Sequence, residues 1–291
     1  MSRRHLLMLA ALAAIWGSAF MFTRIALRDL EPTTLILLRM GSGALALAVY
    51  LKATGRSFGV LRPYVLPLAL LALVNTAVPF FFIAWGQQYI SSGLASIFNA
   101  SAPLFTALFA IGYDQSQRVT GLRLAGIVLG FAGVVVLAGF ELSGAERALE
   151  GSLAVVAASA CYAIGGLYAG RRFGGLPPSL VGFGTLAWAT LFVFPFGIAQ
   201  ASMFGWESLL SVLYLGVAAT GVAYLLYFGL IAGAGASKAV LVTYLVPSLA
   251  LVYGAVFLEE TVTAVSLVGL ALVLTGVALG TGFSDRATVR Q

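Results

Sequence analysis

Apolar residues fill most of the chain in long runs, and polar or charged residues are concentrated in the short intervals between these runs. A membrane-spanning helix needs about 20 consecutive, mostly apolar residues. The hydrophobicity of the runs is continuous rather than alternating, which favours helices over a membrane β-barrel. The pattern predicts ten membrane-spanning segments, at residues 6–27, 34–52, 64–86, 92–112, 121–140, 151–170, 179–199, 208–231, 237–257 and 264–283.

The composition agrees with this pattern. Hydrophobic residues make up 61% of the chain and charged residues 9%, and the mean hydropathy is +1.03. Soluble domains contain about 45–50% apolar and about 25% charged residues. We therefore expect an all-α integral membrane protein. Its net charge of +6 does not indicate a nucleic-acid partner, because the arginines lie between hydrophobic segments. A single cysteine, Cys161, excludes an internal disulfide and a multi-cysteine metal site.

The distribution of positive charge predicts the orientation. If the N-terminus is cytoplasmic, alternating segments place 12 lysines and arginines on the cytoplasmic side and three on the opposite side, with Arg39 inside the second segment. Cytoplasmic loops are enriched in lysine and arginine. Both termini are therefore expected in the cytoplasm. The first 20 residues also have features of a signal peptide, although they have a counterpart in the second half of the chain.

The two halves of the sequence resemble each other. Pro103 in "NASAPLFTALF" and Pro247 in "TYLVPSLALVYG" lie 144 positions apart, and Trp16 and Tyr162 lie 146 apart. Matches in the same order and at similar offsets indicate an internal repeat. We predict five-helix repeats at residues 1–145 and 146–283 and a cytoplasmic tail at 284–291. Because five is odd, the second repeat enters the membrane from the opposite face.

Inverted repeats are typical of secondary transporters, in which the substrate site lies near the midplane between the repeats. The pattern therefore favours transport by alternating access. A duplication retained only for packing is the alternative interpretation.

Three motifs show a family resemblance: "WGSAF" (16–20), "LRMGSGALAL" (38–47), and Pro247, Gly254 and Glu260 in the ninth segment. Over nearly its whole length the chain resembles the EamA-type branch of the drug/metabolite transporter superfamily, and within it the YddG-type exporters of aromatic amino acids. The resemblance implies a cavity lined by helices 1, 3, 4, 6, 8 and 9, and a place in a bacterial inner membrane. The sequence departs from the family at "IGYDQS" (111–116), where many members carry a glutamate near residue 116.

Polar and aromatic side chains inside the segments are candidates for substrate binding. Asn99 and Asn75 lie near the middle of their segments, and in lipid such groups either face a cavity or bond to another helix. An amino acid offers an ammonium to aromatic faces and a carboxylate to hydroxyl and amide donors. The candidate substrate-binding residues are Trp16, Ser18, Asn75, Phe80, Asn99, Tyr162, Tyr224 and Tyr244.

Prolines and isolated charges form a second set of candidates. Pro79, Pro103 and Pro247 each remove a backbone donor within a segment, so we expect helix kinks that border the cavity. Arg39 is the one charge well inside a segment. Because the family's cavity does not involve helix 2, a structural role for Arg39 is favoured, either pairing with an acid of the outer loops such as Glu260 or capping of carbonyls. Lys238 is expected to be a topology charge, with attraction of a substrate carboxylate as the alternative.

The residue types that the sequence lacks exclude some classes of transport mechanism and of enzyme. The sequence has no acidic residue in mid-segment, so the usual carboxylate for proton coupling or for cationic drugs is missing, and facilitated transport is expected. The sequence lacks HExxH, and no enzymatic activity, cofactor or metal is predicted. The expected partners are a small metabolite and the lipid bilayer. Transport of drugs or other metabolites, a channel and an intramembrane enzyme are the alternative functions.

GxxxG pairs occur at Gly126/Gly130 and Gly276/Gly280. They either join the two halves or form a homodimer, so the sequence leaves a monomer and a homodimer as alternatives.

Overall fold

The computed structural model describes residues 1–113, 121–141, 147–200 and 203–280, and all regular structure within these ranges is helical. The predicted tail at 284–291 and the boundary between the predicted repeats at 145 and 146 lie outside the described residues. Eight helical stretches are long and apolar enough to cross a membrane, and two shorter apolar helices, Val242–Phe257 and Ala264–Gly280, follow them. The prediction of an all-helical protein with many apolar spans is confirmed.

The first half contains α1 (Arg3–Ala26), α2 (Pro32–Ala53), η1 (Phe58–Tyr64), α3 (Val65–Ala72), η2 (Leu73–Ala77), α4 (Val78–Gly86), α5 (Ser92–Asn99), α6 (Ala102–Tyr113) and α7 (Leu122–Glu141). The second half contains α8 (Ala148–Arg172), α9 (Pro178–Ala199), α10 (Trp206–Leu213), η3 (Tyr214–Val222), α11 (Ala223–Ala234), α12 (Ala236–Ala239), α13 (Val242–Phe257) and α14 (Ala264–Gly280).

Local sequence determines where several helices start. The Ser2 and Ser91 hydroxyls accept hydrogen bonds from the backbone N–H groups of His5 and Leu94, which caps α1 and α5. Pro32 and Pro178 open α2 and α9, where the missing backbone donor has no cost.

The predicted segment at 92–112 is interrupted. α5 ends at Asn99 and α6 begins at Ala102, so Pro103 lies in the first turn of a new helix, where proline is tolerated. The Ser101 N–H and hydroxyl donate to the Phe98 carbonyl oxygen at 3.1 and 2.6 Å, and the Ser159 hydroxyl on α8 lies 3.2 Å from the same oxygen and 3.3 Å from the Asn99 carbonyl oxygen. Hydroxyls of the break itself and of a neighbouring helix thus help to satisfy the carbonyls at the interruption.

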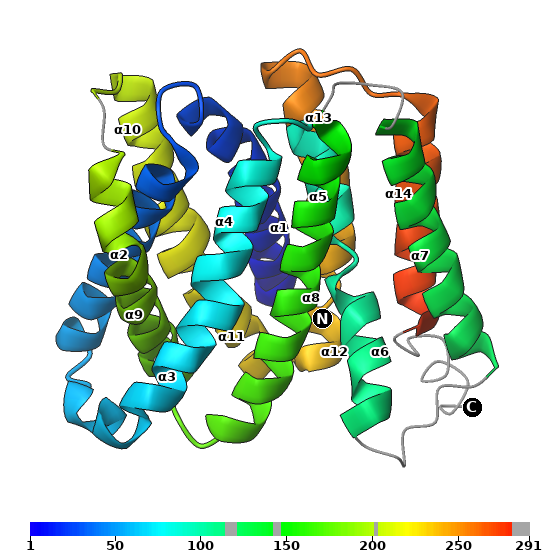
Figure 1. Ribbon diagram of the computed structural model, residues 1–291. Helices are drawn as coiled ribbons and strands as arrows, with labels where there is room; N and C mark the ends of the chain where they lie inside the picture. Colours follow the sequence, from blue (N-terminus) through cyan, green and yellow to red (C-terminus); the bar gives the residue numbers. More distant parts are fainter. Residues whose placement is uncertain (114–120, 142–146, 201–202, 281–291) are drawn as a thin grey trace.

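The bundle is arranged as packed pairs. α7 packs against α14 at one edge, α2 packs against α9 towards the other, and α1 with α13 and α4 with α8 lie between them (Figure 1). A Cβ atom at Gly126 or Gly276 would overlap the backbone of the facing helix, so these glycines allow the close approach of α7 and α14. The GxxxG pairs therefore join the two halves within one chain.

Candidate functional site

A cavity of about 430 Å³ lies in the centre of the bundle, between helices of both halves. Six aromatic rings line it, from Trp16, Phe20, Phe80, Tyr162, Tyr224 and Tyr227. Polar lining side chains come from Thr23, Arg39, Asn75, Ser96, Asn99, Thr220 and Thr243. No acidic residue is among the lining residues, so the described wall carries one formal charge, that of Arg39.

Most of the candidates from the sequence meet at this cavity. The predicted substrate-binding residues that line it are Trp16, Asn75, Phe80, Asn99, Tyr162 and Tyr224. Pro103 and Pro247 border it as well, the first at the α5–α6 break and the second inside α13. Two of the eight predicted substrate-binding residues lie elsewhere.

Ser18 and Tyr244 are these two exceptions. The Ser18 O–H donates to the Ile15 carbonyl oxygen at 3.0 Å, and the Ser18 hydroxyl lies 2.7 Å from the Tyr214 hydroxyl, so Ser18 joins α1 to η3 outside the cavity. Tyr244 packs against the apolar core around Phe98. The neighbouring residue Thr243 lines the cavity instead, because one helical position rotates a side chain by about 100°.

The remaining candidates also lie away from the cavity lining. Pro79 is buried at the start of α4, directly after the π-helical turn η2. Lys238 is exposed on α12. Glu260 caps the start of α5, where its carboxylate accepts hydrogen bonds from the Ser92 backbone N–H at 2.8 Å, the Ser92 hydroxyl at 2.8 Å and the Gly93 backbone N–H at 3.2 Å. These partners leave no role for Glu260 as the partner of Arg39.

Arg39 differs from the expectation for helix 2. Its side chain is 7% exposed and lines the cavity, with the guanidinium carbon 4.3 Å from the centre of the Phe80 ring. The Arg39 Nε–H points to the Thr220 hydroxyl oxygen at 3.4 Å. No carboxylate among the described residues pairs with it. Pairing with an acid, one of the structural roles expected for Arg39, is thus absent among the described residues, and helix 2 contributes to the cavity because α2 packs on η3.

Two π-helical turns flank the cavity. They span Leu73–Ala77 and Tyr214–Val222, and their threonines, Thr76 and Thr220, lie 144 positions apart. Such turns interrupt the regular helix and occur frequently at functional sites. The Trp16 indole N–H donates to the Ala219 carbonyl oxygen at 3.1 Å, so a lining ring also stabilises one of these turns. The sequence analysis did not predict either turn, and the spacing of Thr76 and Thr220 indicates only that the two turns occupy equivalent positions of the two halves.

The same spacing relates other parts of the cavity wall. Lining residues 144 positions apart include Phe80 and Tyr224, Ile83 and Tyr227, Asn99 and Thr243, and Pro103 and Pro247. Equivalent positions of the two halves thus form facing parts of one wall. This correspondence extends the proline match seen in the sequence to the residues that surround the cavity.

Asn99 has an unsatisfied polar atom. Its Oδ1 is buried, and no described residue donates a hydrogen bond to it. It lies at the carboxyl end of α5, where helix carbonyls carry partial negative charge.

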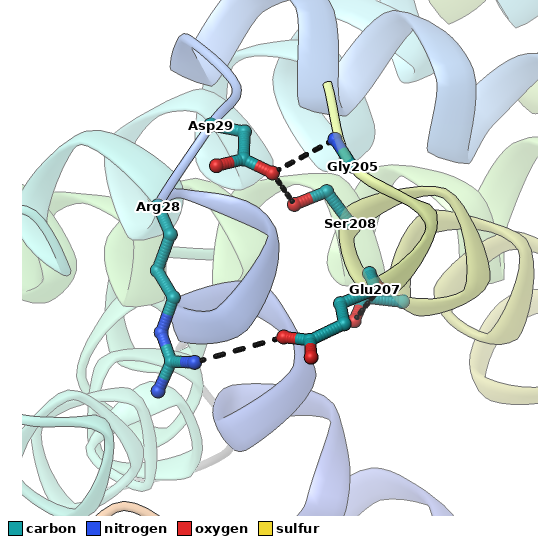
Figure 2. Close-up of polar contacts among 6 residues, drawn as sticks. Arg28, Asp29, Gly205, Glu207 and Ser208 are labelled. Carbon is teal, nitrogen blue, oxygen red and sulfur yellow. Dashed lines mark hydrogen bonds and ion pairs between the residues drawn. The ribbon is translucent and has the colours of Figure 1, made fainter.

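Polar contacts at the end of the bundle that is uppermost in Figure 1 connect loops to helix starts. The Asp29 carboxylate accepts hydrogen bonds from the Ser208 hydroxyl at 2.8 Å and the Gly205 backbone N–H at 3.0 Å, and Arg28 pairs with Glu207 at 3.9 Å (Figure 2). The hydrogen bonds from Ser208 and then Gly205 lower the pKa of Asp29 below its ordinary value of 3.8. Any stability that Asp29 contributes is therefore present above this value and lost as the pH falls through the lower folded-state pKa.

The described residues contain no group of three or more potential metal ligands. What the site offers instead is an aromatic cavity with one cation and two amides inside a bundle of apolar helices. Polar groups of this kind enclosed by transmembrane helices mark a substrate pathway. Fold and site together define a membrane transport protein.

Comparison with known proteins identifies the family. The model of the EamA-like transporter family matches residues 3–139 and again residues 149–281, and the chain belongs to this family. It is a transporter, as the resemblance implied, and not an enzyme.

Named relatives and a solved structure agree with this assignment. The chain is 28% identical to a "Probable amino-acid metabolite efflux pump" of Salmonella typhimurium, over 100% of this chain and 99% of the relative. It is 29% identical to a "Probable terminal-alkyne amino-acid exporter" of Streptantibioticus cattleyicolor, over 91% and 89%. A solved crystal structure has the same fold, with a TM-score of 0.71 at 22% identity over 98% of this chain and 100% of that one.

Proposed function

We propose that this protein exports neutral amino acids, aromatic ones above all, from a bacterial cell by alternating access through the central cavity. The protein resides in the inner membrane with both termini in the cytoplasm. It has ten spans, which form two inverted five-helix repeats at residues 1–145 and 146–283. The names of the two relatives above, an amino-acid metabolite efflux pump and a terminal-alkyne amino-acid exporter, support this substrate class.

The composition of the cavity wall carries the proposal. A volume of about 430 Å³ is within the range of about 300–1,000 Å³ typical of small-molecule sites. Six lining rings suit an aromatic side chain. Arg39 disfavours cationic drugs, because no lining carboxylate offsets its charge.

The paired cavity residues support the mechanism. Because lining residues of the two halves occur at a constant spacing of 144, each half supplies an equivalent part of the wall. Inverted halves that share one site can exchange an open and a closed gate by rocking against each other. The lining has no acid to carry a proton, which favours facilitated transport driven by the substrate gradient.

Uptake by proteoliposomes tests this function. We expect phenylalanine, tyrosine and other neutral amino acids to equilibrate faster in vesicles with the purified protein than in empty vesicles, without a pH gradient or a membrane potential. The measurement is uptake of radiolabelled amino acids, and vesicles with heat-denatured protein are the control. If no amino acid enters faster than in the control, the proposed substrate class is wrong. If transport requires a pH gradient, the facilitative mechanism is wrong.

A further inference from the structure

The guanidinium of Arg39 is a charged group in the cavity wall that has no anionic partner among the described residues. Its side chain is 7% exposed, its guanidinium makes one long hydrogen bond to Thr220 among the described residues, and the face of Phe80 lies beside it. A guanidinium has five N–H donors in a planar fork, and buried cations are normally paired with an anion. Arg39 thus presents unused donors to the cavity that it lines.

The surroundings hold this group in place. The Thr220 hydroxyl donates to the Leu215 carbonyl at 2.8 Å within η3, so its oxygen is fixed where it meets Arg39 Nε. Phe80 lies 4.3 Å beneath the guanidinium, and its ring meets Tyr162 edge-on at 6.1 Å between centroids. A charge that is fixed in advance loses little entropy when a ligand binds.

From this geometry we propose that Arg39 binds the substrate carboxylate, and that the cavity selects for a carboxylate more strongly than for an ammonium. This inference rests on the proposed function and gives the substrate class as small carboxylates with an aromatic or apolar side chain. Arginine forms paired, charge-assisted hydrogen bonds with carboxylates. The ammonium meets only neutral acceptors and rings, because no lining residue is acidic.

The proposal predicts the order in which related ligands bind, from the highest to the lowest affinity. An aromatic acid without an amino group keeps the Arg39 contact, whereas an amine or an amide without the carboxylate loses it and places its own group beside an unpaired cation. We expect 3-phenylpropanoate to bind within about tenfold of phenylalanine, and phenylalaninamide and phenethylamine to bind weaker by roughly tenfold to a hundredfold.

Competition on the purified protein tests this order. The four compounds are titrated against the fluorescence of Trp16, which lines the cavity, in a variant where Trp85, Trp188 and Trp206 are phenylalanine, and each is then used to inhibit phenylalanine uptake. In the R39Q variant we expect the two carboxylates to lose affinity to the level of the amide and the amine. R39K should recover part of the carboxylate preference. R56Q removes a charge from an exposed position beyond α2 and should leave the order unchanged.

Each outcome is decisive. If the amide or the amine competes as well as phenylalanine in the unsubstituted protein, the inference is overturned even if R39Q fails to fold. The same holds if none of the four compounds binds, or if R39Q keeps the preference. If 3-phenylpropanoate binds through Arg39 but no amino acid is transported, the inference stands and the proposed amino-acid function falls.

Discussion

At the scale of single residues, the cavity separates two kinds of polar group. Arg39 supplies donors, whereas the buried Oδ1 of Asn99 is an acceptor without a donor among the described residues. An unpaired buried acceptor costs about 1–3 kcal/mol, which a ligand with N–H groups would recover. The position of Asn99 at the carboxyl end of α5 favours a cation there. An amino acid that binds Arg39 with its carboxylate has its ammonium free for this second contact.

Replacement of Asn99 separates the two contacts. We expect N99A to raise the KM for phenylalanine by roughly tenfold, because one charge-assisted hydrogen bond is lost. Its affinity for 3-phenylpropanoate should change little, since that ligand has no ammonium. Uptake and competition on the same preparation measure both. An equal loss for the two ligands would show that Asn99 shapes the cavity without contacting the ammonium.

At the scale of elements, hydropathy could predict where the apolar helices lie but not which face of each meets the cavity. Asn99 and Pro103 were identifiable because a polar residue and a proline are costly inside an apolar run. Thr243 lines the cavity where the sequence suggested its neighbour Tyr244, and this difference is a rotation of about 100° that only the packing partner determines. The π-helical turns also change which side chains of a helix face the cavity. Arg39 reaches the cavity because α2 packs on η3, and its partner Thr220 lies 181 positions away in the sequence.

Helix capping by Glu260 gives a prediction at the same scale. Three hydrogen bonds from Ser92 and Gly93 connect the loop after α13 to the start of α5, a helix that carries Asn99. We expect E260A to destabilise the protein by about 1–2 kcal/mol, since it removes three hydrogen bonds that supplement the Ser91 cap at the start of α5. Thermal unfolding in detergent measures this, and the exposed neighbour Glu259, changed to glutamine, is the matched control. Equal melting temperatures for E260A and E259Q would contradict a capping role.

At the scale of the whole molecule, the proposed transport cycle depends on how the chain crosses the membrane. Lining residues at a constant spacing of 144 become equivalent gates only if the second half enters from the opposite face. The excess of lysine and arginine on one side of the predicted topology sets the direction. In the proposed topology five spans separate the loop at Arg56 from the loop at Glu207, so these two exposed residues are expected on opposite sides of the membrane.

Single cysteines test this topology, because Cys161 is the only native cysteine and C161S provides a cysteine-free background. In intact spheroplasts, a membrane-impermeant maleimide should label the R56C variant poorly and the E207C variant well. After permeabilisation it should label both equally, which controls for reactivity. Labelling of R56C alone in intact spheroplasts would show that the orientation is the opposite of the proposed one. Labelling of both would mean an even number of spans between the two loops, and the halves would then be parallel and unable to supply the inverted gates that alternating access requires.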